Sequence, residues 1–182
     1  MKRFTQAGRL ALKEKNWYAA LFLALTLPDI CGSFDEPSAG NGKRYKNWCD
    51  KWLMDKFKIP ASPGRDEIIL LNSADLFQLR CSLLHEGSGD IDEEKRRALA
   101  SFKFFDETGS SHLNRVGESV VDGVKVPSYL QLRTENFCND VFDAVDRWDA
   151  SASPEIQAEK SGLLKINSEG DRIGGIQFGF RK

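Results

Sequence analysis

An arginine in the apolar face of a capped helix is the feature that most restricts how this chain folds. The stretch Asn72–Gly87 reads NSADLFQLRCSLLHEG, with Ser73 placed as N-cap, Asp75 in the first turn and Gly87 as the C′ residue. At about 100° per residue, the apolar side chains that surround Arg80 are Leu76, Phe77, Leu83 and Leu84. Because a buried guanidinium is costly without a partner, the fold must supply one.

Composition and charge argue against several classes of protein. The 182 residues fit one domain, or a domain with a small subdomain, and the net charge of −1 gives no general attraction to nucleic acid or anionic membranes. No P-loop, GxGxxG, HExxH or GxSxG occurs. The two histidines and four widely spaced cysteines form no metal-ligand pattern and suit a reduced, cytoplasmic protein. We therefore expect no metal and no cofactor.

One apolar run near the N-terminus needs a decision between a core helix and a targeting segment. Trp17–Leu27 is too short to span a bilayer as a helix. Its long basic leader contains Glu14, which suits a secretory signal poorly, although Cys31–Ser33 resembles a cleavage site. A buried first helix and no membrane association are expected.

Helical periodicity dominates the first half of the chain. An apolar pattern runs from Phe4 to about Cys31, and Pro28 is expected to kink or end it. A second helix is predicted within Lys43–Phe57, where the residues at helical spacing are Tyr45, Trp48, Trp52 and Leu53. With the Asn72–Gly87 helix and the Gly/Pro/Ser-rich loops between them, these segments predict an antiparallel bundle.

The pattern changes after about residue 90. Leu99–Asp106 reads as a strand, Ser119–Val126 as a hairpin that turns at Asp122-Gly123, and Tyr129–Arg133 as a further strand. Helical spacing returns from Thr134, on a face made of Phe137, Val141, Val145 and Trp148. A short helix is expected to begin at Ser153-Pro154, and the glycine-rich tail is either an edge strand or poorly ordered. We predict a single, mainly α domain: residues 1–90 form the helical bundle, 91–133 a small antiparallel β element, and 134–182 C-terminal helices and a tail that pack back on the bundle.

Arg80 and His85 admit a structural and a functional interpretation. In the structural one, Arg80 pairs with an acid of a neighbouring helix, Asp29 for example, and His85 caps its own helix. In the functional one, they are half of a site for metal-free RNA cleavage, in which the 2′-OH attacks the phosphate. Histidine serves as general acid or base, and the arginine stabilises the phosphorane charge. A two-fold axis near the end of the helix would complete the site with a second copy.

The six residues Arg80-Cys-Ser-Leu-Leu-His85, on a capped helix that follows two longer helices, resemble the R-x4–6-H motif of the HEPN superfamily. The resemblance covers about Phe4–Gly87 and implies a helical, commonly dimeric protein. Many members are metal-independent endoribonucleases of toxin–antitoxin, phage-defence and RNA-processing systems, and others are non-catalytic binding modules. Arg80 and His85 match the motif, whereas Cys81 stands where the family often has Asn, Asp or His.

Other residues are candidates for supporting roles. Asp29 is placed to orient Arg80 or His85, or is a plain exposed acid at a helix end. Ser82 supplies a polar group near the arginine, and Glu86 is either supporting or solvated. The basic aromatic stretch that contains Lys43, Arg44 and Tyr45 either tracks an RNA backbone by charge and stacking or forms a solvated helix face. His112 lies in turn-rich sequence and has no expected role.

The sequence thus predicts a HEPN-like endoribonuclease with Arg80 and His85 as catalytic residues. The alternative is a non-catalytic HEPN-like binding or interaction module. In both cases the chain is expected to form a homodimer through the Asn72–Gly87 helix. The endoribonuclease would take RNA as its substrate, and an antitoxin or regulatory protein is a candidate partner.

Overall fold

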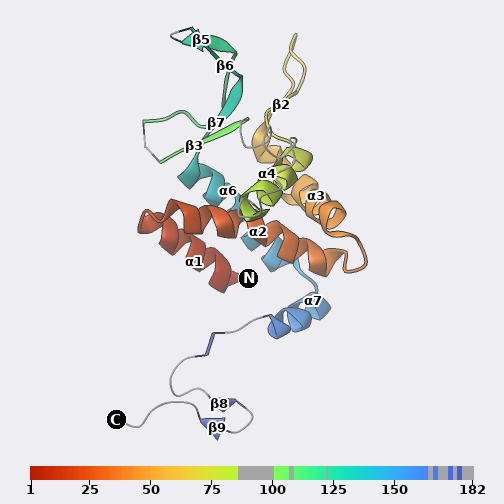
Figure 1. The fold of residues 1–182 in the computed structure, drawn as a ribbon. Coiled ribbons are helices and arrows are strands. Elements are labelled where there is room, and N and C mark those ends of the chain that lie inside the picture. Colours follow the sequence, from red (N-terminus) through yellow and green to blue (C-terminus); the bar gives the residue numbers. More distant parts are fainter. Residues whose placement is uncertain are drawn as a thin grey trace, which may run out of the picture. The chain divides into compact units, whose positions relative to one another are not determined.

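The structure, a computed structural model, is mainly helical with several small sheets, as the sequence predicts (Figure 1). It describes residues 1–85, 101–106, 109–121, 123–163, 166–167, 172–173 and 176–177; of residues 85, 172–173 and 176–177 it describes the backbone only. Contacts divide the chain into two units, residues 1–152 and residues 153–182. Each unit is considered by itself.

The first unit contains most of the regular structure. Its helices are α1 (Lys2–Lys13), α2 (Trp17–Asp35), α3 (Asn41–Trp52), the short 3₁₀ helix η1 (Met54–Phe57), α4 (Ser73–His85) and α6 (Thr134–Ser151). Its strands are β1 (Lys58–Ile59), β2 (Ile68–Ile69), β3 (Phe102–Phe105), β4 (Asn114–Val116), β5 (Ser119–Val121), β6 (Val124–Val126) and β7 (Tyr129–Arg133).

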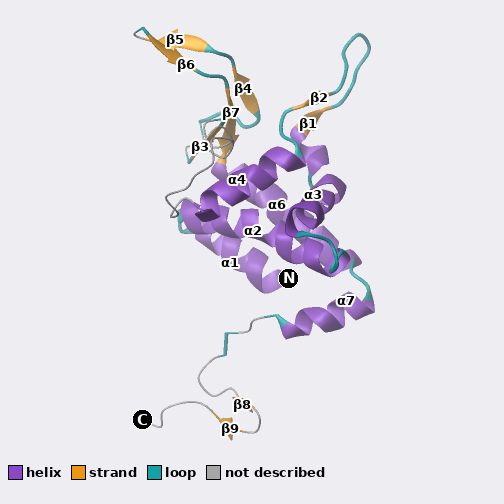
Figure 2. Ribbon diagram, turned by 45° about the vertical axis from the view of Figure 1, so that its right-hand side comes forward, coloured by secondary structure: helices purple, strands orange, loops and turns teal. Residues whose placement is uncertain are grey.

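Helix α2 is the centre of the first unit. It contacts α1, α3, α4 and α6, and these helices of the first unit lie together in Figure 2. Its buried residues are Ala20, Leu21, Ala24, Leu25, Leu27, Pro28, Cys31 and Gly32. Of the helices described, α2 alone is long and apolar enough to cross a membrane. That is weak evidence for a membrane protein, because the buried core helix of a soluble protein passes the same test.

The long apolar pattern at the N-terminus forms two helices, and the break is not where the sequence predicts it. The chain turns at Lys15, which has a positive φ of 55°, and Asn16 then caps α2 by accepting the N–H of Ala19 at 3.2 Å. Pro28 lies inside the helix and does not end it, and α2 continues to Asp35. Packing of α2 against four other helices overrides the local effect of the proline.

The predicted apolar face of the last long helix is confirmed. Phe137, Val141 and Val145 of α6 are 0% exposed, and Trp148 is 1% exposed. The predicted helix within Lys43–Phe57 is also present, as α3 followed by η1. Its buried residues Trp48, Leu53 and Phe57 join α6 in the core, where the rings of Phe57 and Phe137 lie 5.9 Å apart.

The sheet of the second half is mixed, so the expectation of a purely antiparallel β element is wrong in part. Strand order is β3-β7-β4, with β7 antiparallel to β4 but parallel to β3. A parallel pair needs a long connection, and the chain between β3 and β7 supplies it, since that connection contains β4, β5 and β6. The predicted hairpin is confirmed: Val121 pairs with Val124 across Gly123, which has a φ of +78°. Asp122 lies outside the described residues.

A second small β pair occurs where only a loop is predicted. Strands β1 and β2 pair antiparallel on either side of the Pro/Gly-containing segment 60–67. In the unit formed by residues 153–182, α7 (Pro154–Glu159) begins as predicted, because the Ser153 hydroxyl accepts the N–H of Ile156 and proline occupies the first turn. It leads into η2 (Lys160–Gly162), and the tail contains the antiparallel pair β8 (Arg172–Ile173) and β9 (Ile176–Gln177).

Two buried thiols are held protonated by the core. Burial raises the pKa of Cys138 to about 12. Burial also raises the pKa of Cys49 well above its ordinary value, and the negative charge of Asp50 adds to this effect. Since the charged thiolate is excluded from an apolar core, both side chains behave there as small hydrophobic groups.

These thiols predict a loss of stability in alkali. In the unfolded chain Cys138 titrates near 9.0, so between about pH 9 and 12 the folded state binds more protons than the unfolded state, and the free energy of unfolding falls as pH rises. By pH 10.5 the Cys138 contribution amounts to roughly 2 kcal/mol. Urea unfolding at several pH values measures how steeply the free energy of unfolding falls with pH. Cys138→Ala is expected to make this fall less steep. An equally steep fall in that variant would assign the effect to other groups.

Candidate functional site

Helix α4, which carries Arg80, is capped one residue earlier than the sequence predicts. The Asn72 side chain accepts the backbone N–H of Asp75 at 2.8 Å, and the Asp75 carboxylate accepts the N–H of Asn72 at 3.4 Å. This reciprocal arrangement is a capping box, so Asn72 is the N-cap and Ser73 is the first helical residue. The proposed C′ residue, Gly87, lies outside the described residues.

Arg80 is mostly buried, as its position among apolar residues predicts. Its side chain is 16% exposed. The neighbouring Leu76 and Leu79 are 0% and 3% exposed, whereas Leu84 is 39% exposed. The buried stripe of α4 is therefore displaced from the predicted one, and Arg80 lies towards its edge.

The guanidinium of Arg80 finds its partner on α2. Arg80 Nη2 donates to Asp29 Oδ2 at 3.0 Å, and Arg44 Nε of α3 donates to Asp29 Oδ1 at 3.1 Å. All three side chains are 15–19% exposed. We call this group the Asp29 cluster. The predicted pairing of Asp29 with Arg80 is confirmed, and the alternative of an exposed acid at a helix end is wrong, because Asp29 lies inside α2.

Close approach of α2 and α3 brings the cluster together. A Cβ atom at Gly32, one turn after Asp29, would lie 2.7 Å from the backbone oxygen of Arg44. A side chain larger than hydrogen would therefore push the two helices apart. Glycine at this position allows Arg44 to reach the carboxylate on the same face of α2.

The Asp29 cluster carries a net charge of +1, from two guanidinium groups and one carboxylate. Arg80 Nε is buried and has no hydrogen-bond partner among the residues described. The planar fork of an arginine matches the oxygens of a phosphate, and a partly desolvated cation binds such a group more strongly than an exposed one. The cluster is thus chemically suited to hold an anion.

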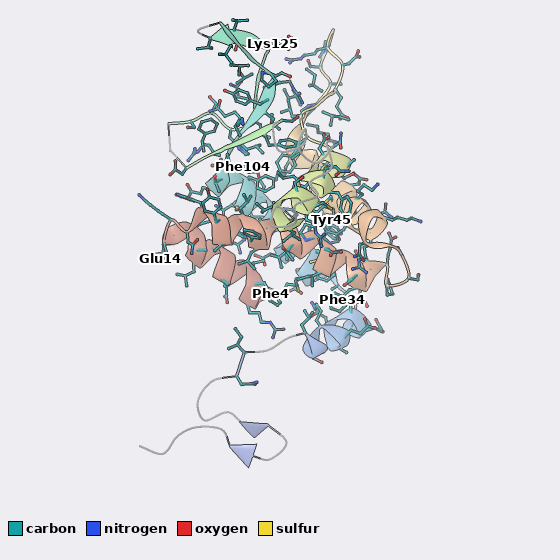
Figure 3. The ribbon with its side chains drawn as sticks, in the orientation of Figure 1. Phe4, Glu14, Phe34, Tyr45, Phe104 and Lys125 are labelled. Atoms are coloured by element: carbon teal, nitrogen blue, oxygen red, sulfur yellow. The ribbon has the colours of Figure 1, made fainter. Side chains whose placement is uncertain are left out.

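Tyr45 belongs to the core and does not stack on RNA. Its side chain, labelled among the helices in Figure 3, is 0% exposed. Its hydroxyl donates to the backbone oxygen of Leu25 at 3.2 Å, and its ring lies 5.5 Å from that of Phe77. Burial raises the pKa of Tyr45 well above its ordinary value. The expected stacking role is wrong because apolar packing between α3 and α4 uses the whole ring. Lys43 is exposed, so the basic run divides between core, cluster and solvent.

Helix α4 also carries Ser82 and the backbone of His85. Ser82 is 1% exposed and follows Arg80 by two positions, which places it about 160° away around the helix. The expectation that it supplies a polar group beside the arginine stays a prediction. The backbone of His85 ends α4, about 7.5 Å beyond Arg80 along the helix axis. Its side chain and Glu86 lie outside the described residues.

His112 has partners that sequence reasoning did not anticipate. Its Nδ1 accepts the N–H of Arg133 at 3.1 Å, and its Nε2 lies 3.7 Å from Asp140 Oδ2. The other oxygen of Asp140 lies 3.7 Å from Lys56 Nζ. Because both ring nitrogens face groups of the protein, His112 connects the sheet to α6. Nothing local in the turn-rich sequence around it signals these long-range contacts.

Comparison with protein-family models, with curated proteins and with solved structures found no match to this chain. In the part of the chain that the structure describes, no group of three or more His, Cys, Asp or Glu side chains could hold a metal ion. The chemistry of the Asp29 cluster is therefore the main structural guide to function.

Proposed function

We propose that this chain is a HEPN-like, metal-independent endoribonuclease that acts as a homodimer. The observation that carries the proposal is the Asp29 cluster, a group of net positive charge to which α2, α3 and α4 each contribute one residue. The helix that contributes Arg80, α4, ends at His85. Arg80 would bind the scissile phosphate, Arg44 would add charge, and Asp29 would hold both arginines in place. The same proposal includes a cytoplasmic role as a toxin or in phage defence. It also includes an antitoxin as the partner protein.

The proposed reaction needs a proton acceptor, a proton donor and a cation. The 2′-oxygen attacks phosphorus and loses its proton to a base, while the 5′-oxygen leaves and takes a proton from an acid. A cyclic phosphate and a new 5′-hydroxyl are formed, and no metal is required for the balance. His85 fills the base or acid role, because imidazole titrates near neutral pH. Arg80 stabilises the additional negative charge on the phosphorane.

A second copy of the chain would complete this site. One chain contributes one histidine at the end of the helix that carries Arg80. Two copies related by a two-fold axis contribute two such histidines. Leu84, directly before His85, is 39% exposed. An exposed apolar side chain at this end of α4 supports packing against the same helix of another copy.

The second candidate is a HEPN-like module that binds without cleaving. It is favoured by the 16% exposure of Arg80 and by the Asp29 carboxylate, which already occupies one of its terminal nitrogens. Cys81 in place of the polar residue common in the family points the same way. In this case the cluster is a structural or phosphate-binding element, and RNA, if bound, stays intact.

The test is cleavage of a fluorescent single-stranded RNA in EDTA by purified wild-type and variant proteins. His85→Ala is expected to lower the cleavage rate at least about 100-fold, since a general acid or base contributes roughly 10²–10⁴-fold. Arg80→Lys retains the charge but loses the fork and is expected to lower it comparably. His112→Gln, which changes the other histidine, is the matched control and should cleave like the wild type.

Binding and mass measurements separate the outcomes. Circular dichroism and light scattering are expected to show the same fold and dimer mass for wild type and His85→Ala. Equal cleavage by both would assign the activity to a contaminant or another site. RNA binding without cleavage, weakened by Arg80→Lys and by salt, would favour the binding module. If the protein neither binds nor cleaves RNA, both candidate functions are overturned.

A further inference from the structure

A small aromatic cavity opens at the start of α2, away from the Asp29 cluster. It has a volume of about 270 Å³, just below the roughly 300–1,000 Å³ typical of small-molecule sites. Residues of α2, of the end of β3 and of the start of α6 line it: Trp17, Tyr18, Leu21, Phe104, Asp106 and Thr134. Asp29 lies twelve residues after Trp17 in α2, so about 18 Å of helix separates cavity and cluster.

The walls of this cavity are held in place by the core. The ring of Phe104 packs edge-on against Phe137, with centroids 5.3 Å apart, and Figure 3 shows Phe104 next to the helices. Leu21 is 8% exposed. Thr134 donates its hydroxyl proton to the backbone oxygen of Phe105 at 3.1 Å. Tyr18, in contrast, is 76% exposed, so its ring is available to a ligand.

Charge decides which ligand suits the cavity. Among the described residues that line it, Asp106 alone is charged, and three of the six are aromatic. Aromatic faces and a carboxylate both attract a cation. A phosphate or carboxylate ligand would instead be repelled by the negative charge of Asp106. Trp17 and Asp106 also line an adjoining cavity of about 610 Å³, which in addition carries Lys13, Lys15 and Glu135.

We propose that this cavity binds a methylated ammonium group. Such a cation is large, weakly hydrated and apolar at its surface, so aromatic rings replace its water shell at low cost. Asp106, which is exposed, balances the charge. The group can belong to a small molecule such as choline or to a trimethylated lysine side chain, since both present the same head group.

Isothermal titration of the full chain with choline and with its neutral isostere 3,3-dimethyl-1-butanol tests the role of charge. Choline is expected to bind at least about tenfold more tightly than the isostere. Asp106→Asn and Tyr18→Leu are each expected to weaken choline about tenfold or more. Glu135→Gln removes a carboxylate of the neighbouring cavity only and is the matched control, with affinity unchanged.

A trimethyl-lysine peptide and adenosine monophosphate complete the experiment. If the peptide binds more tightly than choline, the ammonium group belongs to a protein side chain. If choline binds more tightly, it belongs to a small molecule. Equal binding of choline and isostere would reduce the cavity to an apolar pocket. Preference for adenosine monophosphate, or no heat from any cation up to about 10 mM, would overturn the proposal.

Discussion

Asp29→Ala is expected to lower the free energy of unfolding by about 3 kcal/mol. The substitution leaves Arg44 and Arg80 with 16–19% exposure and no counter-charge. Removing one partner of a buried ion pair costs roughly 3–5 kcal/mol, because the remaining charge is neither solvated nor neutralised. The residual exposure of this cluster places the effect at the lower end of that range. Urea unfolding followed by circular dichroism measures it.

An exposed ion pair provides the matched control for Asp29. Asp143 accepts from Arg9 at 2.7 Å, but its side chain is 57% exposed and that of Arg9 is 35% exposed. Asp143→Ala is therefore expected to cost about 1 kcal/mol or less, although its contact is shorter than those of Asp29. An equal loss from both substitutions would mean that the Asp29 cluster is effectively solvated.

A triple variant tests whether charge is the cause. Asp29→Leu, Arg44→Met and Arg80→Met together remove both guanidinium groups and the carboxylate while keeping the volume of the cluster. Such replacements are often neutral or stabilising in proteins. The triple variant is expected to recover most of the stability lost in Asp29→Ala and to lose any binding of RNA. A triple variant less stable than Asp29→Ala would show that the arginines contribute mainly through packing.

Features of the fold that arise within one helix could be predicted from the sequence. The apolar spacing of α6 and the burial of Arg80 follow from periodicity and from the position of the arginine in it. The break between α1 and α2 could not, because it depends on a single positive φ at Lys15 and on the Asn16 cap, with neither glycine nor proline to mark it. Pro28, the stronger local signal, is overridden by packing.

Features that join distant segments were only partly predictable. A buried guanidinium requires an acid, which makes Asp29 a candidate partner of Arg80 from the sequence. The hydrogen bond from Arg44 to Asp29 depends on the close contact that Gly32 allows between α2 and α3. No local pattern in α3 encodes this contact. The parallel register of β3 and β7 likewise depends on a long connection between them. The catalytic assignment of His85 stays a prediction.

Trp148→Ala is expected to have the largest effect on stability among the single substitutions considered, a loss of about 4 kcal/mol. The Trp148 side chain is 1% exposed in α6, its Nε1 donates to Asp35 Oδ1 at 2.9 Å, and its ring lies 6.2 Å from that of Phe34. Truncation opens a large cavity and breaks a hydrogen bond to the end of α2. For a chain of this size the melting temperature is expected to fall by roughly 8–16 °C in a thermal scan.

Two further variants separate packing from hydrogen bonding. Trp148→Phe retains most of the buried ring but loses the donor to Asp35, and a cost of about 1–2 kcal/mol is expected. Tyr18→Ala removes an aromatic side chain that is 76% exposed and should change stability by no more than about 0.5 kcal/mol. Similar losses of stability for Trp148→Ala and Tyr18→Ala would contradict a core in which α6 packs against α2. A loss in Trp148→Phe as large as in Trp148→Ala would assign the stabilisation to the Asp35 hydrogen bond instead of to the ring.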